Sequence, residues 1–281
     1  ARHGVESNNT SAHKSVKSSA THAFVLKGWH VPNAERMWDF NVLSKPLAYP
    51  QEQINNFFGA LRIATKANTG YAQIYSISKG WAAHNKSDLP FAQGVTVRSY
   101  PGWFENYYWN IETVPSISNE EMDQISTLYN SIESATENSI HLSIKRLNQC
   151  LVRDNEEDSV LDATIALEAL LSDDGKQEMT HKLAMRIGAL SRLEKSYDRT
   201  PFDSFGDVKK IYAYRSAIVH GNKALEKKKV IKIDEGNEVN THVLAVEYLR
   251  MILRAVLNNP DYRVPLNIDE KLLLNYGIEN A

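Results

Sequence analysis

The chain has 281 residues, of which 42% are hydrophobic and 23% charged, and its formal net charge of −2 excludes a polycation. This length suits one or two domains with enough chain to bury a core. No stretch approaches about eighteen consecutive apolar residues, so the sequence predicts no transmembrane helix and no membrane partner. The only cysteine, Cys150, excludes an internal disulfide framework and is typical of a reducing compartment, so we expect a cytoplasmic protein.

The first 115 residues differ in composition from the rest. Residues 1–22 are rich in Ser, Asn, Thr and His and poor in large apolar side chains, so we expect disorder there. Residues 23–115 contain all five tryptophans, and we expect them to form a smaller, aromatic-rich accessory or sensor domain of mixed α/β or β-rich structure. Its aromatic side chains suit either a core, which we favour, or stacking on bases. This domain is also the candidate surface for a phage or antitoxin partner.

Local patterns in residues 23–115 indicate short strands and one helix. The strand-like stretches are bounded by turn residues; they are HAFVLKGWHV, YAQIYSISKGW, QGVTVRSY and YYWNIETV. In PQEQINNFFGALRIATK, apolar residues recur at spacings of three and four, which predicts an amphipathic helix.

Residues 116–281 show helical periodicity instead. We expect five helices, in the segments SISNEEMDQISTLYNSIESATENSIHLSIKRLNQCLV, EDSVLDATIALEALLSDD, MTHKLAMRIGALSRLEK, FDSFGDVKKIYAYRSAIVHG and THVLAVEYLRMILRAVLNNP. Mostly short connections predict an up-and-down helical bundle. Residues 222–240 are the exception, and we expect a small hairpin or a loop there. The predicted fold class is therefore α+β in two parts, with an all-α C-terminal bundle.

End signals place some of the helix boundaries. Ser118 with Glu121 matches a capping box at the start of the first helix. Ser204 and Asp207 are candidate caps of the fourth helix, and Gly221 is placed to end it.

Charge is distributed unevenly along the second part. Residues 154–178 contain nine acidic residues and one basic residue, whereas residues 205–232 contain eight basic residues and two acidic ones. A basic surface of this kind attracts an anionic polymer such as RNA even on a near-neutral protein. A solvated lysine face is an equally good interpretation.

Arg215 and His220, in YRSAIVHG, are the best candidates for chemistry. The sequence has no nucleotide-binding glycine loop, no HExxH and no paired Cys–His spacing, so we expect no metal and no cofactor. Imidazole moves protons near neutral pH, and guanidinium grips two phosphate oxygens. Together they suit attack by a ribose 2′-OH on the neighbouring phosphate, which leaves a 2′,3′-cyclic phosphate. The plainer alternative is a helix end with a polar face.

The spacing of this pair favours a homodimer. Five residues advance an ideal helix by roughly 500°, so the two side chains point about 140° apart. A second copy of the same helix is able to bring two Arg–His pairs into one cleft.

The segment YRSAIVHG on the fourth predicted helix resembles the Rx4–6H motif of the HEPN superfamily. The preceding LDATIALEALLSDDGKQEMTHKLAMRIGALS resembles the second and third helices of the Apea-like HEPN subgroup. The resemblance covers residues 118–258, about half the chain. It implies a helical bundle that dimerises through the motif helices and acts as a metal-independent endoribonuclease in toxin systems or abortive phage defence. Arg215 and His220 would be its catalytic pair.

Two features keep alternatives open. Many nuclease members of the superfamily carry Asn, Asp or His after the arginine, where this chain has Ser216. Some HEPN domains are non-catalytic, so an RNA- or protein-binding scaffold is the alternative function.

Further residues are assigned supporting roles. Glu168 and Arg186 either act near the site, with Glu168 orienting an arginine, or form an inter-helix ion pair that fixes bundle register, which we favour. Ser216 and Asn222 are also expected to support the site. Phosphate contacts are expected from Lys223, Lys227, Lys228 and Lys229.

Overall fold

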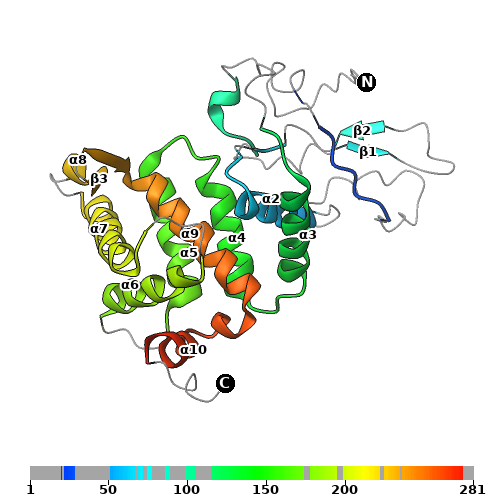
Figure 1. Cartoon of the computed structure of the whole chain (residues 1–281). Coiled ribbons are helices and arrows are strands. Elements are labelled where there is room, and N and C mark those ends of the chain that lie inside the picture. Colours follow the sequence, from blue (N-terminus) through cyan, green and yellow to red (C-terminus); the bar gives the residue numbers. More distant parts are fainter. Residues whose placement is uncertain are drawn as a thin grey trace. The chain divides into compact units, whose positions relative to one another are not determined.

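A computed structural model describes much of the chain (Figure 1). The described residues are 20, 22–28, 51–67, 69–71, 75–77, 86–88, 99–105, 115–173, 178–194, 199–221, 225–234 and 236–274. The chain divides into two compact units: residues 1–58 with 67–116 form one, and residues 59–66 with 117–281 form the other. The expected disorder of residues 1–22 falls almost entirely outside the described residues. Within the described residues, no helix combines the length and apolar content that crossing a bilayer requires.

The first unit contains the beginning of one helix and a small sheet. Helix α2 spans Gln51–Ala64, as its apolar spacing predicts. Strand β1 (Tyr75–Ile77) lies within YAQIYSISKGW and pairs antiparallel with β2 (Lys86–Asp88). A 3₁₀ turn covers Gly102–Glu105. The strand expected at YYWNIETV lies outside the described residues, as does all of QGVTVRSY except a bend at its last two residues.

The strand expected at HAFVLKGWHV is wrong for residues 22–28, which have no regular secondary structure. A strand needs a hydrogen-bonded neighbour, and none pairs with this segment in the described residues. Side-chain packing holds it instead, because the Phe24 ring lies 4.5 Å from that of Phe57 and 5.7 Å from that of Phe58. Phe58 also packs 5.1 Å from Tyr71 and is buried, so it belongs to the core of this unit, whereas Phe24 is 55% exposed.

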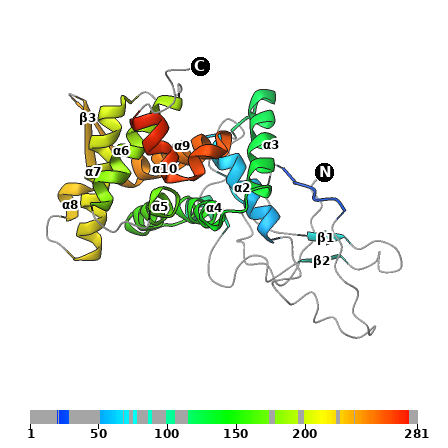
Figure 2. The ribbon, with the colours of Figure 1, turned by 90° about the horizontal axis from the view of Figure 1, so that it is seen from below.

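The second unit is a helical bundle followed by a short C-terminal segment (Figures 1 and 2). Its elements in chain order are α3 (Asn119–Glu133), α4 (Asn138–Cys150), α5 (Glu156–Leu171), α6 (Met179–Leu190), α7 (Pro201–Val219), α8 (Leu225–Lys228), β3 (Val230–Asp234), β4 (Asn237–Asn240), α9 (Thr241–Asn258), α10 (Pro265–Ile268) and a π-helical turn (Asp269–Leu273). No strand occurs in the described part of residues 118–220, as the helical periodicity predicts.

The single long helix expected after Ser118 is wrong, because it is broken into α3 and α4. The capping box at Ser118 forms as predicted, with Ser118 and Glu121 exchanging hydrogen bonds. The helix ends at Glu133, where the Ser134 hydroxyl donates to the carbonyl of Ser131 (3.2 Å). Ser, Thr and Asn side chains compete with the helical backbone for hydrogen bonds, and the segment SIESATENS is dense in them.

Helix α7 has its N-cap four residues before Ser204, the first of the two caps that we expected. Thr200 is the N-cap and forms a capping box with Asp203, and Pro201 takes the first helical position, where its missing N–H costs nothing. Ser204 and Asp207 are instead buried within the helix. The predicted C-terminus is confirmed, because Gly221 follows the last helical turn with a positive φ of 60°.

Helix α5 is the centre of the bundle and packs against α4, α7 and α9. Its buried face includes Val160, Thr164, Leu167 and Leu171, which are fully buried, and Leu161 beside them is half-buried. Helices α6 and α7 lie side by side (Figure 2). The expected hairpin is confirmed as β3–β4, and the Lys210 ammonium of α7 donates to the carbonyl of Lys232 on β3 (3.3 Å). Helix α7 is therefore held from α5, α6 and the hairpin.

Candidate functional site

Arg215 of α7 lies against Glu168 of α5. Its Nη2 is 3.6 Å from Glu168 Oε1, and the two side chains are 36% and 24% exposed. This separation is longer than a hydrogen bond, so the ion pair is loose. The Nε of Arg215 is buried and has no hydrogen-bond partner among the described residues. The guanidinium is therefore restrained on one side, while part of it reaches solvent.

His220 is the residue at which α7 ends. It has φ −99° and ψ 4°, and its backbone N–H donates to the carbonyl of Ser216 (3.1 Å). The residue is exposed, and its imidazole makes no hydrogen bond or ion pair within the described residues. No interaction joins His220 to Arg215 in the described structure, in line with the roughly 140° that separates the two side chains around the helix. One protomer therefore does not bring the pair together.

Tyr212, one turn before Arg215, belongs to the same contact and was missed by the sequence reasoning. Its hydroxyl donates to the carbonyl of Thr164 on α5 (3.4 Å). Burial raises the pKa of the phenol, and the charge of Glu168 raises it further, while Arg215 acts in the opposite sense. The signal available in the sequence was spacing. Tyr212 precedes Arg215 by three residues and Thr164 precedes Glu168 by four, so each pair lies on one face of its helix.

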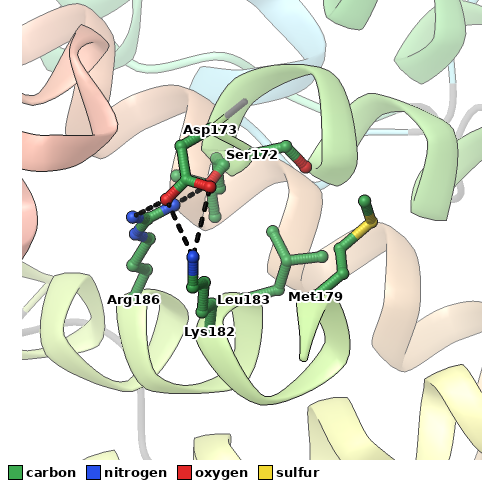
Figure 3. Close-up of a pocket in the computed structure, with 7 residues that line it drawn as sticks. Ser172, Asp173, Met179, Lys182, Leu183 and Arg186 are labelled. Atoms are coloured by element: carbon green, nitrogen blue, oxygen red, sulfur yellow. Dashed lines mark hydrogen bonds and ion pairs between the residues drawn. The ribbon is translucent and has the colours of Figure 1, made fainter. Parts of the chain in front are cut away.

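Arg186 lies elsewhere, in a network of its own (Figure 3). Its side chain is 2% exposed. The guanidinium donates to both carboxylate oxygens of Asp269 (2.8 and 2.5 Å), to Asp173 (2.7 Å) and to the carbonyl of Leu171 at the end of α5 (2.5 Å). Hydrogen bonding to Asp269 raises the pKa of this guanidinium against the effect of burial. These contacts fasten α5, α6 and the C-terminal turn together, and Glu168 does not take part in them.

The predicted supporting residues Ser216 and Asn222 and the four predicted RNA-binding lysines fall into three groups. Asn222 and Lys223 lie outside the described residues. Ser216 and Lys227 are exposed. The other two lysines are engaged: Lys228 donates to the carbonyl of Ala213 on α7 (3.1 Å), and Lys229 pairs with Glu226 (2.9 Å), whose hydrogen bond and charge raise the lysine pKa.

The described residues contain no group of three or more His, Cys, Asp or Glu side chains that is placed to hold a metal ion. Comparison of the chain with protein-family models, with curated proteins and with solved structures finds no match.

Proposed function

We propose that the chain is a metal-independent endoribonuclease of the HEPN kind, acting in the cytoplasm in phage defence or as a toxin. The observation that carries the proposal is the placement of its two candidate groups on α7. His220 stands exposed at the helix end, five residues after Arg215, and among the described residues the Arg215 guanidinium is held by a 3.6 Å ion pair alone. A proton-transfer group and a guanidinium with spare donors are the minimum set for cleaving RNA without a metal.

The chemistry follows from the ribose next to the phosphate. Arg215 donates hydrogen bonds to the non-bridging oxygens, which gain negative charge as the phosphorus becomes pentacoordinate. A neutral His220 accepts the proton of the 2′-OH, the 2′-oxygen bonds to phosphorus, and the P–O5′ bond breaks. A protonated imidazole returns a proton to the leaving 5′-oxygen. In a homodimer the two copies of His220 supply the base and the acid.

An exposed face of α7 supports assembly through this helix. Phe202, Lys209, Ser216 and His220 are all exposed and are separated by seven, seven and four residues, so they lie on one face. Phe202 is 83% exposed, the highest value among the large hydrophobic side chains of the described residues. Gly206 lies on the same face, and a Cβ built there would meet nothing within 4 Å. The face is therefore open to a second copy of α7.

We expect the purified protein to be a dimer at micromolar concentration, as measured by light scattering. Phe202→Glu should make it monomeric and remove RNA cleavage, because a buried unpaired charge in an apolar contact is costly. Leu266→Glu is the matched control, since Leu266 is also exposed (57%) but lies on α10. A monomeric wild-type protein with full activity would contradict assembly through α7.

A non-catalytic RNA- or protein-binding scaffold is the second candidate. The observation that favours it is the Arg215–Glu168 pair, because Glu168 offsets the charge that a phosphate would meet. The residue after the arginine, Ser216, also departs from the residue types of many HEPN nucleases.

RNA cleavage in EDTA separates the two functions. We expect the purified protein to cut a labelled RNA in the presence of EDTA and to leave 2′,3′-cyclic phosphate ends. A phosphatase that removes only open phosphate monoesters should not remove these cyclic ends. A substrate with 2′-deoxyribose at the cleavage position should resist, because the attacking oxygen is missing. Binding without cleavage would favour the scaffold, and cleavage of the 2′-deoxy substrate at the same position would reject the mechanism.

A further inference from the structure

Glu168 occupies the Arg215 guanidinium in the free protein. Its Oε1 lies 3.6 Å from Nη2 of Arg215, and no other acidic side chain pairs with Arg215 in the described part of the chain. The glutamate and arginine side chains are 24% and 36% exposed, so solutes reach the pair from solvent. A partly exposed ion pair at this separation is weak. An anion that is also held by other contacts is therefore able to displace the carboxylate.

The position of Glu168 on its own helix does not explain a carboxylate there. Glu168 lies in the last turn of α5, where the helix dipole disfavours negative charge. The acidic side chains of the first turn, Glu156, Glu157 and Asp158, lie at the end where the dipole favours them. Among the described residues, the ion-pair partner of Glu168 is Arg215. The carboxylate therefore acts on α7 rather than on the stability of α5.

Glu168 and a phosphate compete for the same nitrogen of Arg215. The Nε of this guanidinium is buried, so a phosphate has no access to it. Two hydrogen bonds to a phosphate then have to come from the terminal nitrogens Nη1 and Nη2. Nη2 is the nitrogen that faces Glu168. A phosphate that binds both nitrogens brings its negative charge against the carboxylate, and like charges at such a distance repel.

We propose that Glu168 is an internal competitor of the RNA phosphate: its carboxylate holds Arg215 in the free protein, and a bound phosphate takes its place. The consequence for cleavage rests on the proposed function, whereas the competition for Arg215 concerns binding alone. Glu168 lowers the affinity of the site for any RNA. An RNA held at several positions displaces it, and an RNA that meets Arg215 alone does not.

An orienting role for Glu168 predicts the opposite result. A carboxylate that positions Arg215 for the substrate is needed for binding, so its removal weakens RNA affinity. A carboxylate that competes with the substrate hinders binding, so its removal strengthens RNA affinity. The sign of the change therefore separates the two roles.

The first measurement is the affinity for a 2′-O-methyl RNA oligonucleotide, which lacks the attacking hydroxyl and is not cut. We expect Glu168→Gln to bind this oligonucleotide about threefold to fivefold more tightly than wild type, the range that an exposed ion pair allows. Glu168→Ala should change the affinity in the same direction and serves as the second variant if Glu168→Gln folds poorly. Urea unfolding curves show whether each variant is folded.

Glu137→Gln is the matched control. Glu137 pairs with Arg263 at 3.4 Å and is 38% exposed, so the variant makes the same charge change at an ion pair of similar length. This pair joins the start of α4 to the turn after α9 and includes no residue of α5 or α7. Glu137→Gln should therefore leave the affinity for the oligonucleotide unchanged.

The second measurement repeats Glu168→Gln in an Arg215→Ala background. There the substitution should have no further effect on the affinity, because no guanidinium is left to compete for. A gain of equal size in both backgrounds would mean that Glu168 repels RNA by its charge alone, and it would reject the competitor role.

Binding and cleavage together keep the two proposals apart. If Glu168→Gln binds more tightly through Arg215 while the wild-type protein cuts no RNA, the competitor role stands and the proposed endoribonuclease fails. If the wild type cuts RNA and neither Glu168 variant binds more tightly than wild type, the competitor role is rejected and the endoribonuclease stands. If the wild type cuts no RNA and neither variant gains affinity, both proposals fail.

Discussion

His220→Ala is expected to lower RNA cleavage by about 10²–10⁴-fold, the range that general acid–base catalysis contributes. His220 is exposed at the end of α7, and its side chain makes no contact in the described residues that holds the fold. Truncation should therefore leave the unfolding free energy and the RNA affinity close to wild-type values. His181→Ala is the matched control, because His181 is also exposed on a neighbouring helix but carries no proposed role.

Arg215 variants complete the same test. Arg215→Ala should lose cleavage and also bind RNA more weakly, because the phosphate contact goes with the guanidinium. Arg215→Lys should restore little activity, since a point charge does not reproduce the planar donor fork. The measurements are cleavage rates in EDTA and affinities for a 2′-deoxy-substituted RNA. Wild-type cleavage rates in both His220→Ala and Arg215→Ala would show that the two residues take no part in cleavage and only belong to the end of helix α7.

The helices that could be predicted from the sequence carry their signals locally. Helix α2 has a clear apolar period, and α9 ends just before Pro260. The boundary between α3 and α4 could not be predicted in the same way, because the apolar period continues through it while Ser, Thr and Asn side chains open the backbone. The start of α7 was missed because Ser204 and Asp207 resemble caps, although both lie inside the helix.

The partners of polar side chains in distant segments could be predicted from the sequence only as alternatives. Glu168 was expected to orient an arginine or to form an inter-helix ion pair, and the choice between Arg215 and Arg186 depends on how α5 turns toward α7. The main partner of Arg186, Asp269, lies 83 residues away, in a segment with no predicted element. No spacing rule connects such positions, because tertiary packing decides which polar groups meet.

The Tyr212 contact shows the same limit at the candidate site. A tyrosine at helical spacing from an arginine is common, and only the buried position of its hydroxyl between α5 and α7 singles it out from Tyr214. Periodicity places both tyrosines on a helix and leaves their environments undetermined.

Arg186→Met is expected to cost about 3 kcal/mol of unfolding free energy, at the lower end of the range for removing one partner of a buried ion pair. The change leaves three acceptors without their donor, namely the carboxylates of Asp269 and Asp173 and the carbonyl of Leu171 at the end of α5. The two carboxylates are 29% and 35% exposed, so water compensates part of the loss and the full range is not expected. Methionine keeps most of the side-chain volume, so the effect reports the lost donors rather than a cavity.

Lys182→Met is the matched control for this stability prediction. Lys182 lies one turn before Arg186 on α6 and also pairs with Asp173. Its side chain is 43% exposed, and its Nζ is 3.3 Å from the nearer carboxylate oxygen of Asp173. An exposed pair of this kind contributes about 0–1 kcal/mol, so Lys182→Met should be nearly neutral. Urea unfolding measures both variants, and hydrogen exchange over residues 265–274 tests whether the C-terminal segment opens first in Arg186→Met. Equal stability of the two variants would mean that Arg186 does not fasten that segment to α5 and α6.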